Sequence, residues 1–143
     1  RFDLDIILLA GRYTLLDHSG LSKFLPACVE RDVKITIGGP YNSGILARDL
    51  SQPVTFDYEQ ASDDLVSTAR KLTEICVAHG VDLKAAALQF VLAHPAVATA
   101  VPGAQTIAEL EQNIAMVQQD IPNAVWSDMR SAGLIPDDAP TPD

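Results

Sequence analysis

Residues 97–113 read VATAVPGAQTIAELEQN, and this stretch decides the fold because it joins a strand, a turn and a helix start. A short apolar strand pattern precedes a Pro-Gly turn, and Thr106 and Glu109 then have the spacing of a capping box. In such a box the side chain of Glu109 reaches back to the amide of Thr106. The free amides of the first helical turn, together with the helix dipole, favour an anion there. The stretch therefore predicts a phosphate site; a strand-to-helix turn without a ligand is the alternative.

Strand and helix patterns alternate along the whole chain. Strands are predicted over residues 4–10, 33–37 and 97–101. Helices are predicted over residues 21–31, after Ser62 to Gly80, after Asp82 to Ala93, after Thr106, and over residues 123–131. This alternation is typical of parallel strands joined by right-handed crossovers, an α/β fold in which ligands bind beyond the carboxyl ends of the strands.

Several of these patterns also predict burial or flexibility. The nearly unbroken Ile and Leu content of residues 4–10 predicts a parallel strand covered on both faces. Pro26 is expected to confine or kink its helix, because proline removes a backbone hydrogen bond. Residues 47–61, with Pro53, are predicted to form a loop, and residues 136–143 a mobile Pro- and Asp-rich tail. The helix that opens with the capping box is predicted to have a buried stripe formed by Ile107, Leu110, Ile114 and Val117.

Three segments, in sequence order, resemble parts of the aldo-keto reductases. Residues 88–113 are similar to the cofactor-binding end of that family, residues 9–17 to its sixth barrel strand and the loop that follows, and residues 38–46 to the end of its seventh strand. The strings AGRYTLL at residues 10–16 and PYNSG at residues 40–44 are similar to the aldose 1-dehydrogenase subgroup, which includes L-fucose and D-threo-aldose dehydrogenases. The resemblance covers nearly all of the chain.

The resemblance implies the C-terminal part of a (β/α)8 TIM barrel, about its sixth to eighth strands with their helices. A complete barrel needs about 250 residues, whereas this chain has 143. Residues 1–143 are therefore expected to form a single unit, an incomplete barrel that belongs to a longer enzyme. A complete small α/β domain is the alternative that the length permits.

The family's cofactor contacts carry over to two groups of residues. The loop after the seventh strand wraps the cofactor pyrophosphate in the family, and the matching positions here are Gly39, Pro40, Asn42, Ser43, Gly44 and Leu46. The adenosine end is held at positions that match Gly103, Ala104, Gln105, Glu109, Gln112 and Asn113. Glycines permit close backbone approach, and the side chains of Asn42 and Ser43 are able to donate hydrogen bonds to phosphate. A plain turn and a solvated helix face are the alternatives for the two groups.

The resemblance implies NAD or NADP as the cofactor, and charge favours NAD. The 2′-phosphate of NADP usually demands an Arg or a Lys nearby, yet residues 97–113 contain neither. Glu109 would repel that phosphate, and it is able to accept a hydrogen bond from the free 2′-hydroxyl of NAD. Arg48 and Lys84 are basic residues outside this segment that could reverse the preference.

The family's nicotinamide contacts and its catalytic group are not identified in this sequence. Many relatives place a Gln and a Tyr at the positions of Ala10 and Gly38, so no nicotinamide contact is assigned here. The family's tetrad of Asp, Tyr, Lys and His belongs to earlier strands, and no catalytic residue is assigned. His18 lies in a loop that could approach a substrate. No pair of His or Cys has metal-ligand spacing, so no metal site is predicted.

Composition bears on partners and on location. The net charge of −9 makes nucleic acid and anionic membrane surfaces poor partners, and 48% hydrophobic with 20% charged residues is ordinary for a soluble globular protein. No apolar run reaches the roughly 20 residues of a membrane helix. Cys28 and Cys76 are predicted to be buried free thiols in a reducing compartment, with a disulfide or a reactive pair as the alternative, and the expected location is cytoplasmic.

The resemblance implies the cofactor-binding part of an NAD(P)-dependent oxidoreductase that acts on an aldose or a related aldehyde or lactol. The chain alone is expected to be inactive, because the group that transfers the proton is missing. Self-association is expected, because a partial sheet leaves the edge of residues 4–10 unpaired. The alternatives are a standalone nucleotide- or phosphate-binding module without catalysis, and an assembly domain.

Overall fold

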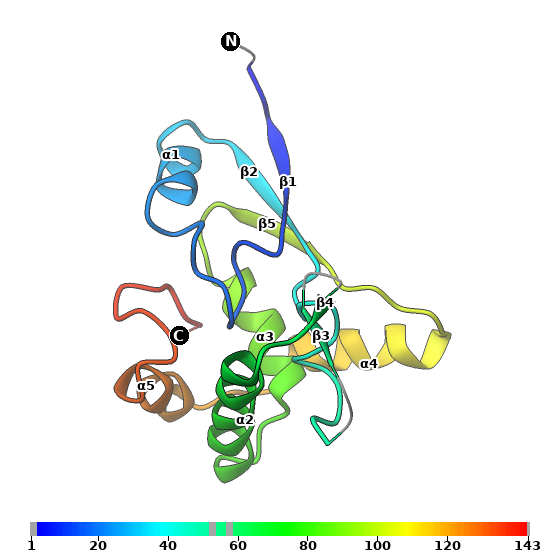
Figure 1. Cartoon of the computed structure of the whole chain (residues 1–143). Coiled ribbons are helices and arrows are strands. Elements are labelled where there is room, and N and C mark those ends of the chain that lie inside the picture. Colours follow the sequence, from blue (N-terminus) through cyan, green and yellow to red (C-terminus); the bar gives the residue numbers. More distant parts are fainter. Residues whose placement is uncertain (1–2, 52–53, 57–58, 143) are drawn as a thin grey trace.

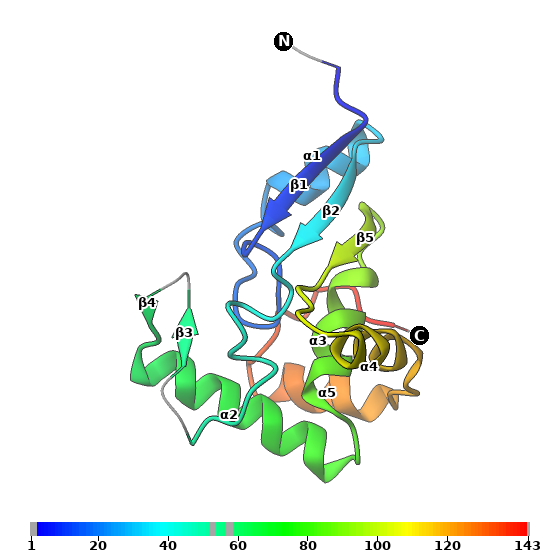
Figure 2. The same ribbon diagram turned by 90° about the vertical axis from the view of Figure 1, so that its right-hand side faces the viewer.

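Three parallel strands form the central sheet of the computed structural model, which describes residues 3–51, 54–56 and 59–142. They are β1 (Ile6–Ala10), β2 (Lys34–Gly38) and β5 (Val97–Val101), in the order β1-β2-β5. β1 and β2 pair from Ile6 beside Lys34 to Ala10 beside Gly38. Figure 2 shows the three arrowheads pointing away from the N-terminus, so the carboxyl ends of the strands meet at one edge. The predicted parallel α/β arrangement is confirmed.

Helices cover one side of this sheet and its carboxyl end. Those in the described part of the chain are α1 (Phe24–Glu30), α2 (Asp63–Ala78), α3 (Leu83–Leu92), α4 (Ile107–Gln118) and α5 (Asn123–Ser131). Figure 1 shows α3 near the middle, with α2, α4 and α5 around it. α3 is buried over most of its surface, and Phe90 and Val91 are fully inaccessible to solvent. It forms the centre of the hydrophobic core.

Side chains and backbone at the helix ends explain the boundaries. The Ser62 hydroxyl accepts a hydrogen bond from the Leu65 amide at 3.4 Å, and the Asp82 carboxylate accepts one from the Lys84 amide at 2.8 Å. Gly80 has a φ of +69°, the left-handed conformation that ends α2 at low cost. The predicted starts of α2 and α3 are confirmed.

Pro26 confines α1, as expected. It lies in the first turn of the helix, where backbone amides have no intrahelical acceptor, so its missing N–H costs little. α1 is accordingly shorter than the predicted residues 21–31. The predicted loop over residues 47–61 contains a short antiparallel hairpin of β3 (Thr55–Phe56) and β4 (Glu59–Gln60). Pro53 lies outside the described residues.

The prediction that residues 4–10 are covered on both faces is wrong. Alternate side chains of β1 are exposed, Ile6 by 54% and Leu8 by 64%. β1 is an edge strand. In Figure 2, α1 lies behind β1 and β2, and no described helix lies in front of them. A strand rich in Ile and Leu is buried on both faces only where a second layer packs on it, and the described part of this chain supplies one layer.

The apolar stripe predicted to be buried on α4 is also exposed. Its exposed fractions are 77%, 53%, 54% and 45% for Ile107, Leu110, Ile114 and Val117. α4 rests on α3 through its other side, where Asn113 is buried and Gln89 donates to the carbonyls of Met116 and Gln119 at 3.0 and 2.7 Å. Periodicity located the apolar face correctly, but no described element covers it.

The predicted mobile tail makes specific contacts over residues 136–142. Arg130 Nη2 donates to the Ala139 carbonyl and to the Thr141 hydroxyl, both at 2.9 Å, and the side chain of Ala139 is buried. These bonds hold the segment against the end of α5. Asp143 lies outside the described residues.

Both cysteines are buried and free, as predicted. Burial, with a smaller contribution from Asp82, raises the pKa of the Cys76 thiol to about 12, so this thiol stays protonated. No single helix within the described ranges is long and apolar enough to cross a membrane; α2 and α3 pass that test only as a pair bent by 100°.

Candidate functional site

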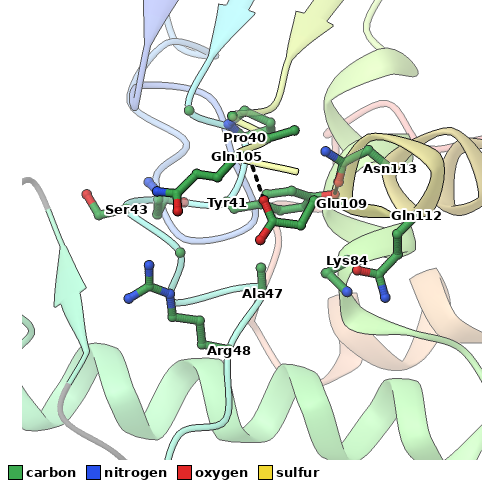
Figure 3. Close-up of a pocket in the computed structure, with 15 residues that line it drawn as sticks. Pro40, Tyr41, Ser43, Ala47, Arg48, Lys84, Gln105, Glu109, Gln112 and Asn113 are labelled. Carbon is green, nitrogen blue, oxygen red and sulfur yellow. Dashed lines mark hydrogen bonds between the residues drawn. The ribbon is translucent and has the colours of Figure 1, made fainter. Parts of the chain in front are cut away.

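A cleft of about 480 Å³ lies between the loop that follows β2 and the segment that follows β5. Figure 3 shows these two segments facing each other across it. The cleft is bordered by residues predicted to hold the cofactor, namely Gly39, Pro40, Asn42, Ser43, Gly44, Gly103, Ala104, Gln105, Glu109, Gln112 and Asn113. Tyr41, Ala47, Arg48 and Lys84 complete its lining. The structure thus brings together two stretches about sixty residues apart in sequence, as connectivity at the carboxyl ends of parallel strands requires.

The first wall is a turn with an unusual run of left-handed residues. Asn42, Ser43 and Gly44 have φ values of +47°, +55° and +94°, and Gly39 has a φ of +61°. Asn is among the few residues other than Gly that adopt this conformation readily, which explains its place in the turn. At Gly44 a Cβ atom would meet Arg48 Nε at 2.9 Å. Glycine here therefore lets the Arg48 side chain lie against the turn.

The side chain of Asn42 is buried without a hydrogen-bond partner. It is 4% exposed, and neither its amide nitrogen nor its amide oxygen bonds to a described residue. An unsatisfied buried amide costs about 1–3 kcal/mol. Asn42 lines the cleft, and a phosphate oxygen would be a suitable partner for its unpaired amide.

The second wall begins at the N-terminus of α4. The Thr106 hydroxyl accepts a hydrogen bond from the Glu109 amide at 3.2 Å, which confirms Thr106 as the predicted cap. The Glu109 carboxylate reaches back to the amide of Gln105 at 2.7 Å, one residue before the Thr106 amide that the sequence predicted. This difference leaves the amide of Thr106 free of the Glu109 side chain.

Tyr41 and Asn113 join the two walls. The Tyr41 hydroxyl donates to Asn113 Oδ1 at 2.8 Å, and the two residues are 72 positions apart. Burial, with a smaller contribution from Asp82, raises the pKa of Tyr41, so the hydroxyl stays a donor. This pairing could not be predicted from the sequence, because nothing in a single chain links a turn tyrosine to an amide on a distant helix.

Arg48 and Lys84 place positive charge along the lower side of the cleft in Figure 3. Arg48 is exposed and Lys84 is half-buried. Neither forms an ion pair with a described carboxylate. Two basic groups without an acidic partner among the described residues make this side of the cleft attractive to an anion.

The structure does not bring Leu46 to the cleft surface. Leu46 is 1% exposed and belongs to the hydrophobic core. Its neighbours Ala47 and Arg48 line the cleft instead. Near the sheet, Gly38 lies beside Ala10, and a Cβ atom on Gly38 would sit 3.4 Å from that of Ala10 and 3.3 Å from the Leu8 side chain. The carboxyl ends of β1 and β2 therefore carry two small residues.

Among the tyrosines and histidines in the described ranges, Tyr41 alone lines the cleft, and its hydroxyl is engaged in a hydrogen bond to Asn113. Tyr13 is fully buried, with ring centroids 5.2 Å from Phe90 and 5.3 Å from His94. His18 packs edge-on to Phe90 at 5.9 Å, and burial lowers its pKa despite the nearby Asp17 carboxylate. Tyr58 lies outside the described residues. Across those same ranges, no group of His, Cys, Asp and Glu is arranged to hold a metal ion.

Comparison with known proteins identifies relatives that share this sequence. The model of the aldo/keto reductase family matches residues 1–133. Pyridoxal 4-dehydrogenase of Microbacterium luteolum is 41% identical over 133 residues, which are 93% of this chain and 39% of that protein. D-threo-aldose 1-dehydrogenase of a Pseudomonas species is 39% identical over 137 residues, which are 94% of this chain and 41% of that protein. The chain spans about two fifths of the length of these curated relatives.

Solved structures support the fold. The holo form of an aldo-keto reductase from Bacillus halodurans matches with a TM-score of 0.66 at 23% identity, over 87% of this chain and 42% of that one. A thermostable aldo-keto reductase in complex with the inhibitor epalrestat matches with a TM-score of 0.58 at 19% identity, over 87% of this chain and 39% of that one. The parallel strands with their helices correspond to part of a (β/α)8 barrel, as predicted.

Proposed function

Because the chain belongs to the aldo/keto reductase family, we propose that its cleft binds the nicotinamide dinucleotide of an oxidoreductase. The observation that carries the proposal is the convergence of residues 39–48 and residues 103–113 on one cleft at the carboxyl ends of the strands. When bound, the nicotinamide accepts or donates a hydride. The residues of this chain bind and orient the dinucleotide.

The pyrophosphate is proposed to lie against the turn at residues 39–44. The amides of Asn42 and Gly44 already donate to the carbonyls of Gly39 and Tyr41, so the support from this turn is the close backbone approach that Gly39 and Gly44 permit to a phosphate. Arg48 and Lys84 contribute two positive charges that no described carboxylate neutralises. The orphaned amide of Asn42 is a further donor for the same group.

The adenosine end is proposed to lie along α4. The amide of Gln112 offers both a donor and an acceptor to the base edge, and Asn113, whose Oδ1 accepts from Tyr41, offers its N–H groups. Glu109 places a negative charge in the same part of the cleft. We therefore propose that NAD is preferred over NADP, whose 2′-phosphate this carboxylate would repel.

An aldose, or a related aldehyde or lactol, is the proposed substrate of the enzyme in which this chain functions. One relative at about two-fifths identity is a dehydrogenase of D-threo-aldoses by name and another a dehydrogenase of pyridoxal, so both compounds are suitable probes. The proposed location is the cytoplasm, a reducing compartment that suits the free thiols of Cys28 and Cys76.

Calorimetric titration of the chain with NAD, NADP and ADP-ribose tests the proposal. ADP-ribose is expected to bind, because the assigned residues address the pyrophosphate and adenosine. Replacement of Gln112 by Ala should weaken its binding about two- to tenfold, the effect of one lost hydrogen bond. Gln118→Ala on the same helix, outside the cleft, is the matched control and should leave binding unchanged. Absence of binding by all three ligands would overturn the proposal.

A further inference from the structure

We propose that Tyr41 is a positioning residue for base recognition: its hydroxyl fixes the orientation of the Asn113 amide so that the amide N–H groups face the base of the bound dinucleotide. The inference rests on the proposed dinucleotide site. It assigns to Tyr41 a role that acts through Asn113 and involves no contact of its own with the base.

The geometry of the pair supports this role. Tyr41 comes from the turn after β2 and Asn113 from the middle of α4, and the 2.8 Å hydrogen bond is a side-chain bond across the cleft. Figure 3 shows the Asn113 oxygen turned to Tyr41 and the nitrogen turned away from it. Asn113 is 7% exposed and is the one described buried residue of α4. Its burial is explained by the packing of this side of α4 on α3 together with the contact to Tyr41.

The chemistry of a carboxamide explains why the hydrogen bond from Tyr41 to Asn113 matters for base recognition. A free Asn amide can turn over and present either its oxygen or its nitrogen to a base. With Oδ1 occupied by the Tyr41 hydroxyl, the nitrogen with its two protons is left for a ligand. Such a fixed donor selects bases that present an acceptor, as adenine does at N1 and N7. Removing the hydroxyl should release the amide and relax this selection.

Base analogues measure the selection directly. In 1-deazaadenine a C–H group replaces the N1 acceptor and leaves the 6-amino group in place, and 7-deazaadenine likewise lacks the N7 acceptor. The wild-type chain is expected to bind ADP-ribose about tenfold more tightly than the counterpart that lacks the contacted acceptor, the value of one well-placed hydrogen bond. In Tyr41→Phe this ratio should fall to about twofold or less.

Controls separate positioning from a general loss of structure. Tyr13→Phe removes a buried hydroxyl that has no described partner and lies outside the cleft, so the ratio should stay at its wild-type value. In Asn113→Ala the ratio should be low, and adding Tyr41→Phe should change it no further. If Tyr41→Phe lowers the affinity ratio by the same factor in the Asn113→Ala background as in the wild type, the inference is overturned.

The nitrogen resonance of the Asn113 side chain supplies a readout that needs no ligand. In the free wild-type chain its two amide protons should give one sharp, shifted pair in a proton–nitrogen correlation spectrum, and Tyr41→Phe should move or broaden this pair. An unchanged pair would overturn the inference even if nucleotides bind. Failure of the wild type to bind any nucleotide would instead overturn the proposed function, because the spectrum still reports whether Tyr41 holds the amide.

Discussion

Glu109 accepts a hydrogen bond from the backbone amide of Gln105 at 2.7 Å, and this bond fixes a negative charge at the entrance of α4. The same carboxylate lines the cleft opposite Arg48 and Lys84. One side chain therefore both caps a helix and sets the charge next to the proposed adenosine site. The two roles make its replacement informative about cofactor choice.

Replacing Glu109 should shift cofactor preference towards NADP. Glu109 is exposed in the free chain, so its like-charge clash with the 2′-phosphate costs a few kcal/mol only where the bound dinucleotide shields it from water; we expect the chain to bind NAD up to about a hundredfold more tightly than NADP. Glu109→Gln should narrow this gap, and Gln105→Arg combined with Glu109→Ala should narrow it further. Dissociation constants from titration with both cofactors check the prediction.

Glu111 provides the matched control for this prediction. It lies on the same helix and is exposed, but it does not line the cleft. Glu111→Gln removes the same formal charge and should leave the ratio of NAD to NADP affinity unchanged. NADP binding as tight as NAD binding in the wild type would mean that Arg48 or Lys84 reaches the 2′-phosphate.

Arg48 should contribute to anion binding through its unneutralised charge. Arg48 is exposed, so dissolved salt screens its charge. We therefore expect Arg48→Gln to weaken ADP-ribose binding modestly, by about three- to tenfold at low ionic strength. The loss should shrink as salt is added. Lys71→Gln removes a positive charge from the exposed face of α2, outside the cleft, and should have no effect. Equal losses in both variants would indicate a general charge effect.

The capping box of α4 shows which structural features of this protein can be predicted from sequence patterns. Thr106 could be identified as the cap of α4 because capping depends on residues within one turn. The exposure of Ile107 could not be predicted, because spacing indicates which face of a helix is apolar and not whether another element covers it. The same limit applies to Leu8 on β1. The pairing of Tyr41 with Asn113 could not be predicted for a related reason, since it is set by the fold.

Unfolding should become easier as the pH falls below about 6.5, because His94 is buried as the neutral form. Its Nδ1 accepts a hydrogen bond from the Ala96 amide at 3.1 Å, and burial lowers its pKa from the ordinary value of 6.5. The unfolded chain binds the proton first, so the free energy of unfolding is largest above pH 6.5 and decreases as the pH falls towards the folded-state pKa.

Urea unfolding between pH 5 and pH 7.5 tests this dependence. His94→Asn retains an acceptor in the place of Nδ1 but cannot titrate, so its free energy of unfolding should vary less with pH than that of the wild type. His18 should account for part of the remaining dependence, because burial lowers its pKa as well. A wild-type and a His94→Asn curve of the same slope would contradict the prediction.

The chain by itself should not turn over aldoses. Tyr41 is hydrogen-bonded to Asn113, and Tyr13 is buried with a raised pKa, so neither is available to exchange a proton with a substrate in the cleft. We expect no formation of NADH above the blank with aldoses or pyridoxal from pH 6 to pH 10. Turnover that persists after repeated purification would show that this chain carries its own acid or base.

The chain should self-associate through its open sheet. The outer edge of β1 has no strand partner among the described residues, and Leu8 is 64% exposed on the uncovered face. Burying one Leu side chain is worth about 1.5–3 kcal/mol, so Leu8→Lys should weaken association at least about tenfold. Sedimentation velocity over a wide concentration range should detect a dimer or larger species for the wild type. Val77→Lys alters a side chain that is 70% exposed on α2, far from this face, and should sediment like the wild type. A compact wild-type monomer at all concentrations would mean that the apolar sheet face is stable in water without a partner.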